Sequence, residues 1–122
     1  MRELTSHKVN GLNDGLLVTA VDAPGLGNAN HVYDITPTAG NAKGLRIEFQ
    51  NGPLSWNGGV PNGVSNEALL AIVEDRLAGF QAGEFAGEDN AHALVKVREA
   101  MMWLHRRTLG RVARGVEGTH SK

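Results

Sequence analysis

The last third of the chain decides the fold, and from Val64 to Arg114 it runs VSNEALLAIVEDRLAGFQAGEFAGEDNAHALVKVREAMMWLHRRTLGRVAR. Ser65 can cap a helix that continues to Gln81, because a serine side chain accepts a hydrogen bond from the first turn, where Glu67 also suits the helix dipole. Apolar residues then recur at the helical spacing of one buried face. These residues are Leu69, Ile72, Val73, Leu77 and Phe80.

A second helix is predicted from about Glu88 to Arg114, after a connector bracketed by Gly83 and Gly87. Its apolar residues step by 3, 4 and 3 positions, which is typical of the seam of an antiparallel helix pair. At 1.5 Å per residue the two helices measure about 25 Å and about 40 Å, so the second extends beyond the first. The seam residues are Leu94, Val97, Met101 and Leu104.

The chain before Pro61 has a shorter periodicity and frequent turn residues. Three stretches rich in β-branched or alternating apolar residues predict strands at Leu16–Val21, Asn30–Thr36 and Leu45–Phe49. Short connections favour an antiparallel sheet. We therefore expect an α+β fold in a single domain, 1–122, with a small N-terminal antiparallel β-sheet (1–61) followed by a C-terminal antiparallel helical hairpin and tail (62–122).

Composition and charge narrow the kind of function. The chain has 122 residues, no cysteine and a formal net charge of -1. The positive charge gathers near the C-terminus, where four arginines and Lys122 oppose only Glu117. This pattern favours a local anion site over a surface that coats nucleic acid. A core of Ala, Val and Leu buries little area per residue, so a long hairpin is expected to need a partner surface.

Catalytic groups are sparse in the sequence. His31 and Tyr33 share a predicted strand face and could act as a base and a phenol, but a half-buried sheet face explains them better, because no other group converges on them. His92 with Lys96 fits a solvated helix face, and Ser65 fits a cap better than a nucleophile. We find no metal-ligand spacing and no nucleotide-binding or hydrolase motif. The sequence predicts no catalytic residue, no metal and no cofactor.

Binding residues are easier to place. Arg107 and Arg111 lie four residues apart, so their guanidinium groups can converge on a phosphate, or they can simply be a solvated helix end. Phe80 and Asn90 can be core and cap, or they can line a pocket near the connector. In an antiparallel hairpin the two pairs lie about 25 Å apart. They can share one pocket only if two copies pack antiparallel.

Several segments resemble a family of bacteriophage anti-defence "sponge" proteins, which counter the Thoeris and CBASS immune systems by sequestering signalling nucleotides. The resemblance covers roughly Gln50 to His120, and the N-terminal strands match the longer, anti-Thoeris branch. The segments that carry it are Asn51–Pro53, Asn62–Val73, Asp75–Gln81, Asn90–Leu94, Met102–Leu104 and Arg114–His120.

The resemblance implies a non-enzymatic helical-hairpin protein that acts in the host cytoplasm during infection. It implies a pocket at a dimer interface for cyclic ADP-ribose isomers of the glycocyclic type or for cyclic dinucleotides, formed by Phe80, Asn90, Arg107 and Arg111. It also implies a second site for cyclic trinucleotides, where dimers assemble into a hexamer. That site would use Arg114 and the tail residues Gly118, Thr119 and His120.

Two other functions remain open from the residues alone. One is a phosphodiesterase or nucleoside hydrolase that uses His31 and Tyr33. The other is a phage accessory factor that binds DNA or protein through its arginine end. The preferred nucleotide and the choice between dimer and hexamer are not determined by the sequence, because both depend on the shape of the pocket and of the interface.

Overall fold

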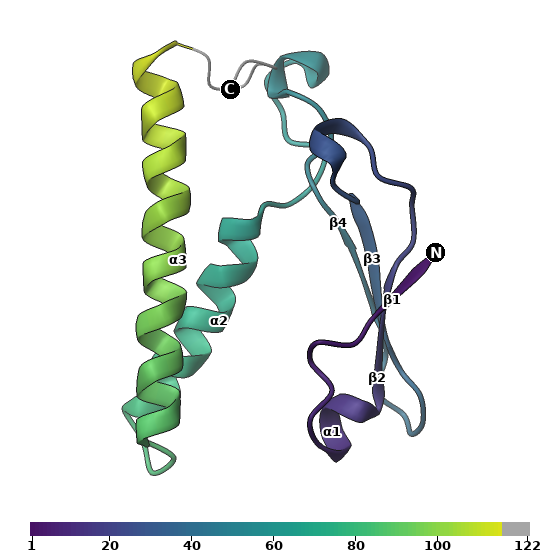
Figure 1. The fold of residues 1–122 in the computed structure, drawn as a ribbon, viewed down its shortest axis with the longest axis vertical. Helices are drawn as coiled ribbons and strands as arrows, with labels where there is room; N and C mark the ends of the chain where they lie inside the picture. The colour runs from purple at the N-terminus through teal and green to yellow at the C-terminus, as the bar shows by residue number, and fades with distance from the viewer. Residues whose placement is uncertain (116–122) are drawn as a thin grey trace. The chain divides into compact units, whose positions relative to one another are not determined.

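The computed structural model describes residues 1–115. The chain divides into two compact units: Met1–Gly52 with Pro61–Val64, and Pro53–Val60 with the chain from Ser65 onward. The first unit is a β-sheet and the second is a helical hairpin (Figure 1). The predicted α+β fold is therefore confirmed. The prediction that all 122 residues form a single domain remains a proposal.

The sheet is a four-stranded antiparallel meander in the order β1-β2-β3-β4. Its strands are β1 (Arg2–Leu4), β2 (Leu16–Ala20), β3 (Val32–Pro37) and β4 (Leu45–Glu48). The last three match the predicted strands. β1 was not predicted, because three residues with two charges among them give no alternating pattern. A short helix, α1 (Gly11–Asp14), was also missed, although Asn10 caps it by accepting a hydrogen bond from the Asn13 amide.

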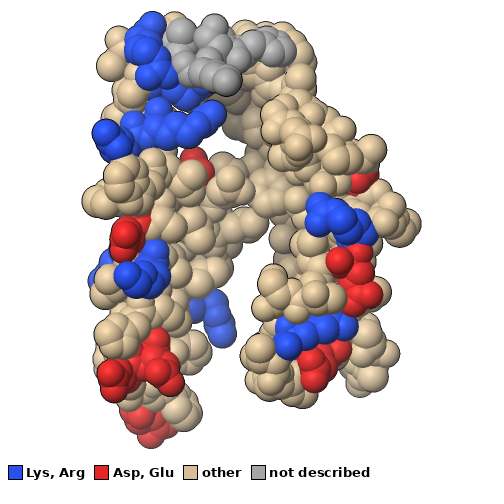
Figure 2. Space-filling model, in the orientation of Figure 1, with Lys and Arg blue, Asp and Glu red and all other residues tan. Residues whose placement is uncertain are grey.

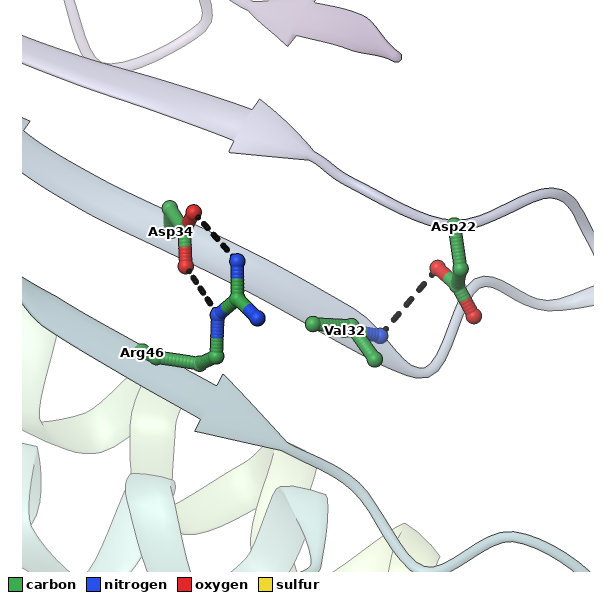
Figure 3. A network of polar contacts seen from close by, with 4 residues as sticks. All are labelled: Asp22, Val32, Asp34 and Arg46. Atoms are coloured by element: carbon green, nitrogen blue, oxygen red, sulfur yellow. Dashed lines mark hydrogen bonds and ion pairs between the residues drawn. The ribbon is translucent and has the colours of Figure 1, made fainter.

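The register gives the sheet one apolar and one polar face. Val18 lies opposite Ile35, which lies opposite Leu45, and on the same face the ring of Tyr33 meets that of Phe49 edge-on at 5.6 Å. On the polar face Arg46 donates two hydrogen bonds to Asp34, at 2.8 and 3.0 Å (Figure 3). The Arg46 guanidinium thereby holds the pKa of the Asp34 carboxyl below its ordinary value.

Asp22 ties together the turn between β2 and β3. Its carboxylate accepts hydrogen bonds from the backbone amides of His31, at 2.9 Å, and Val32, at 3.2 Å (Figure 3 draws the second). The Asn30 side-chain amide also donates to it, at 3.4 Å. These donors, the His31 amide foremost, lower the pKa of Asp22. The loop η1 (Leu26–Asn28) follows Asp22 and turns at Gly27, with φ at 73°.

The hairpin consists of α2 (Asn66–Gln81) and α3 (Glu88–Ala113), preceded by the short 3₁₀ helix η2 (Leu54–Asn57). The Ser65 hydroxyl accepts a hydrogen bond from the Ala68 amide at 3.1 Å, as the capping prediction requires. α2 and α3 have 16 and 26 residues, and α3 continues past α2 at its C-terminal end (Figure 1). The predicted overhang is confirmed.

The packed face of α3 agrees with the predicted seam, whereas on α2 only Leu69 and Leu77 of the predicted face are half-buried. Leu94 is buried and the other three seam residues are half-buried. On α2, however, Ile72 and Val73 are 59% and 43% exposed. Glu74 instead reaches α3, where its carboxylate pairs with Arg98 at 3.0 Å. The prediction failed because α2 carries apolar residues on most of its circumference, so its sequence does not select one face.

Little of either unit is fully buried. Within residues 1–115, the buried apolar residues are Ala20 and Leu94. No helix in that range combines the length and apolar content that crossing a membrane requires. Many large apolar side chains of the hairpin remain exposed, and on α3 these are Val95, Met102, Trp103, Leu109 and Val112. An isolated hairpin of this kind leaves much of its apolar surface in water.

Candidate functional site

The predicted binding residues lie at opposite ends of the hairpin. Phe80 is in the last turn of α2 and Asn90 is in the first turn of α3, so both are at the connector. Arg107, Arg111 and Arg114 lie at the other end of α3. Asn90 and Arg107 are 17 residues apart on one helix, which is about 25 Å. Within one copy, the two groups cannot touch the same small ligand.

At the connector, Phe80 belongs to an aromatic cluster. Its ring is 38% exposed and meets the ring of Phe85 edge-on, with centroids 6.4 Å apart. The guanidinium carbon of Arg76 lies 5.5 Å from the Phe80 centroid. The Asn90 side-chain amide donates to the Phe85 carbonyl at 3.5 Å. Phe80 is thus a partly open ring held by side chains, and is not part of the core.

The sequence reasoning missed Arg76 and Phe85. The first had a usable signal, because Arg76 and Phe80 are four residues apart on one helix and must be neighbours. Phe85 sits in the connector between Gly83 and Gly87, where no periodicity predicts the position of a side chain. It is 70% exposed.

At the far end of α3 the arginines have different surroundings. Arg107 is exposed and makes no hydrogen bond or ion pair with any residue in the range 1–115. Arg111 is only 7% exposed, so it does not fit the alternative in which both arginines form a solvated helix end. It lies on the same side of α3 as the seam of Leu94, Val97, Met101 and Leu104, beyond the end of α2. Arg114 is the exposed C-cap residue.

Gly118, Thr119 and His120, predicted for a second site, lie outside the described residues. Charge is nonetheless separated along the hairpin. Acidic residues gather at its connector end and arginines at the other end (Figure 2). The acidic set includes Glu84, Glu88 and Asp89, and the basic set includes Arg106, Arg107, Arg111 and Arg114.

A groove of about 540 Å³ runs along the side of α3, and the sequence did not predict it. Its apolar residues are the neighbours Met101 and Met102 together with Leu109. The ion pair between Glu74 and Arg98 contributes polar atoms. His105 and Arg106 complete the lining, and Arg106 also stacks over the Trp103 ring at 5.0 Å.

The side chains of the enzyme alternative are used in packing. His31 is 9% exposed, and its ring is so close to Gly25 that a Cβ there would lie 3.5 Å from it. Tyr33 is half-buried against Phe49. Within residues 1–115 there is no cluster of three His, Asp or Glu side chains that could hold a metal ion. Among residues 1–115, neither side chain forms a hydrogen bond with an acidic or basic side chain.

Comparison with known proteins agrees with the hairpin. The sequence profile described as "Acb2/Tad1, hairpin domain" matches residues 41–109. A protein named "Thoeris anti-defense 1", from Bacillus phage SBSphiJ7, is 51% identical over 76 residues. The match covers 62% of this chain and 52% of that protein, so the chain spans about half the length of this curated relative. The chain belongs to the Acb2/Tad1 hairpin-domain family.

Proposed function

We propose that the chain is a phage anti-defence protein that binds and sequesters nucleotide signals of the host immune system without cleaving them. Its similarity to a protein named for anti-defence against Thoeris supports the general role. The ligands we propose are cyclic ADP-ribose isomers and cyclic oligonucleotides, bound in the cytoplasm of the infected cell. Sequestration requires only affinity, so it needs no base, nucleophile or metal at the site.

The observation that carries this proposal is the separation of the pocket residues. Phe80 and Asn90 offer an aromatic ring and an amide, which suit a base. Arg107 and Arg111 offer planar donors, which suit a phosphodiester or pyrophosphate. A nucleotide contains both parts, but about 25 Å of helix separates the residues in one copy. The pocket therefore needs a second copy that packs antiparallel.

An apolar stripe on α3 supports such a pair. Val95, Met102 and Leu109 recur every seven residues and are 56%, 57% and 66% exposed. This is the spacing of a helix-packing seam, and it lies beside the seam that faces α2. If Met102 of one copy packs on Met102 of the other, Val95 lies opposite Leu109 on both sides of the centre, since each is seven residues away. The stripe is therefore self-complementary, as a twofold interface requires.

The same alignment brings the two half-sites together. Asn90 precedes Met102 by twelve residues and Arg114 follows it by twelve, so they lie at the same level in opposite copies. By the same count, Ala93 is level with Arg111. The acidic end of each hairpin then faces the basic end of the other (Figure 2 shows one copy). Phe80 and Asn90 of one copy therefore lie near the level of Arg111 and Arg114 of the second copy, at the same end of the pair.

Close to the centre of the pair, Glu99 is level with His105 of the second copy, which is favourable. Arg98 is level with Arg106, which is unfavourable. Glu74, already paired with Arg98 at 3.0 Å, offsets that repulsion. For a second site, formed where such dimers meet, we propose Arg114 with Gly118, Thr119 and His120 as ligands of cyclic trinucleotides.

Thermal melting in the presence of candidate nucleotides tests the proposal. A ligand at 100 times its Kd stabilises the folded state by about 2.7 kcal/mol, which raises the Tm of a chain of this size by roughly 10 °C. We expect this shift with a cyclic ADP-ribose isomer and not with linear AMP. No shift with any cyclic ADP-ribose isomer or cyclic oligonucleotide would contradict the proposal. Binding to duplex DNA with a steep salt dependence would favour the DNA-binding alternative instead.

A further inference from the structure

The Phe80 ring has neighbours on two of its sides. The Arg76 guanidinium carbon lies 5.5 Å from its centroid, over one face, as in a cation–π contact. Phe85 meets it at an interplanar angle of 87°, with 6.4 Å between centroids, as in an edge-to-face pair. With these two neighbours in place, Phe80 remains 38% exposed.

The connector holds Phe85 in place. The Gln81 side-chain oxygen accepts a hydrogen bond from the Gly87 amide at 3.0 Å, which closes the connector at its base. The Asn90 side chain donates to the Phe85 carbonyl at 3.5 Å. These two contacts lie on either side of Phe85 along the chain and restrain its backbone, although the residue is 70% exposed. The position of Phe85 is therefore set by the connector and by its contact with Phe80, and not by burial in a core.

We propose that Arg76 and Phe85 are positioning residues that hold Phe80 as a one-sided stacking platform for the base of a bound nucleotide. This inference rests on the proposed function. Arg76 occupies one face of the ring and Phe85 restricts its rotation, so a single face is presented to a single base. A flat heteroaromatic ring such as a purine fits that face. A chain without these neighbours would have to order the Phe80 ring on binding, which costs affinity.

The charge of Arg76 and the aromatic ring of Phe85 are the features that this role requires. Arg76→Lys keeps a cation over the ring, and Phe85→Tyr keeps the edge-to-face contact. Arg76→Gln and Phe85→Leu remove them while keeping similar side-chain volumes. From the cost of ordering one side chain, each of the two disruptive variants should weaken binding by roughly 2- to 10-fold. The two conservative variants should restore most of that loss.

The experiment is calorimetric titration of the full chain with the glycocyclic isomer of cyclic ADP-ribose, with the induced circular dichroism of the bound adenine recorded at saturation. We expect Arg76→Gln and Phe85→Leu to lower both the affinity and the induced signal. The Tm of these two variants without ligand should stay close to that of the parent protein. Lys96→Gln, which removes an exposed charge elsewhere on α3, and Ile72→Leu, which alters an exposed apolar side chain on α2, serve as matched controls.

Three different results would overturn the inference. If the parent binds and both disruptive variants match it in affinity and induced signal, Arg76 and Phe85 do not position the ring, and the proposed function stands. If the parent itself binds no cyclic ADP-ribose isomer, the proposed function fails and this inference fails with it. An affinity loss that the Lys and Tyr variants do not restore would also contradict the positioning role.

Discussion

Met102→Asp should dissociate the protein into monomers. Met102 is 57% exposed and lies at the centre of the stripe formed with Val95 and Leu109. Slightly less than half of its surface is already buried in the single chain, so the substitution should destabilise one copy by about 0.6–1.3 kcal/mol. In the proposed pair the same residue occurs twice, side by side, at the twofold axis.

The magnitude follows from burial and charge. Full burial of a methionine side chain stabilises by about 1.5–3 kcal/mol, and little more than half of that remains to be gained at Met102. The two copies together therefore lose roughly 2–3 kcal/mol when Met102 becomes aspartate. Two carboxylates about 6 Å apart repel by about 1–3 kcal/mol, depending on the local dielectric. The sum, about 3–6 kcal/mol, corresponds to a dimer Kd weakened by roughly 100- to 10,000-fold.

Sedimentation equilibrium over a range of protein concentrations measures this change. Met102→Leu, which keeps an apolar side chain of similar volume, should remain as associated as the parent. Leu12→Asp places the same charge at a position 71% exposed in the sheet unit, and it should also leave association unchanged. A Met102→Asp protein that is folded and as tightly associated as the parent would refute the placement of the interface on this face of α3.

Ser65→Ala should lower the free energy of unfolding of the hairpin by about 0.5–2 kcal/mol, because it removes the hydrogen bond from the Ala68 amide to the capping side chain. Ser65→Asp should restore that free energy. Urea unfolding followed by circular dichroism measures the stability of both variants. The stability contributed by Asp22 is present above its unfolded-state pKa of 3.8 and is lost as the pH falls through its lowered folded-state pKa. Asp22→Asn should therefore flatten the acid side of the curve of Tm against pH. An unchanged acid side would count against the bonds to His31 and Val32. Arg107→Ala should weaken nucleotide binding by roughly 10- to 150-fold and leave the Tm unchanged, since Arg107 is exposed. Arg111→Ala should lower both the affinity and the Tm, because Arg111 is buried. Arg107→Lys should still lose affinity, since lysine lacks the planar fork.

The hairpin was predictable because its ends carry local chemical signals. Ser65 caps α2 as its sequence indicates, and the glycines of the connector separate two long periodic segments. The seam of α3 is a regular series of steps, so Leu94 could be placed in advance. The same reasoning fails on α2, where apolar residues surround the helix and a contact with another helix, the Glu74–Arg98 pair, determines which side packs.

The N-terminal unit was predicted less completely. β1 has three residues and is a strand because Arg2, Glu3 and Leu4 pair with β2, which is a long-range relation that a short sequence does not encode. Asn10, by contrast, is a capping residue that the sequence does offer, and it was overlooked.

The candidate site was predictable as a set of residue types and not as an arrangement. The i, i+4 spacing placed Arg107 and Arg111 one turn apart, but it did not indicate that Arg111 is buried. Continuing the α3 seam by two more steps gives the side of the helix on which Arg111 lies, but burial there depends on contacts beyond the end of α2. The neighbours of Phe80 depend on the path of the connector, which only the three-dimensional structure defines.

The central claim is that the protein holds a nucleotide signal without altering it, and recovery of the ligand tests this most directly. The protein is mixed with a stoichiometric amount of the glycocyclic isomer of cyclic ADP-ribose, incubated for hours and denatured by heat, and the supernatant is separated by chromatography. We predict that no free ligand is detected before heating and that the intact cyclic nucleotide is recovered in full afterwards. A linear or hydrolysed product would identify an enzyme, and free ligand before heating would show that nothing is sequestered; either result would contradict the account.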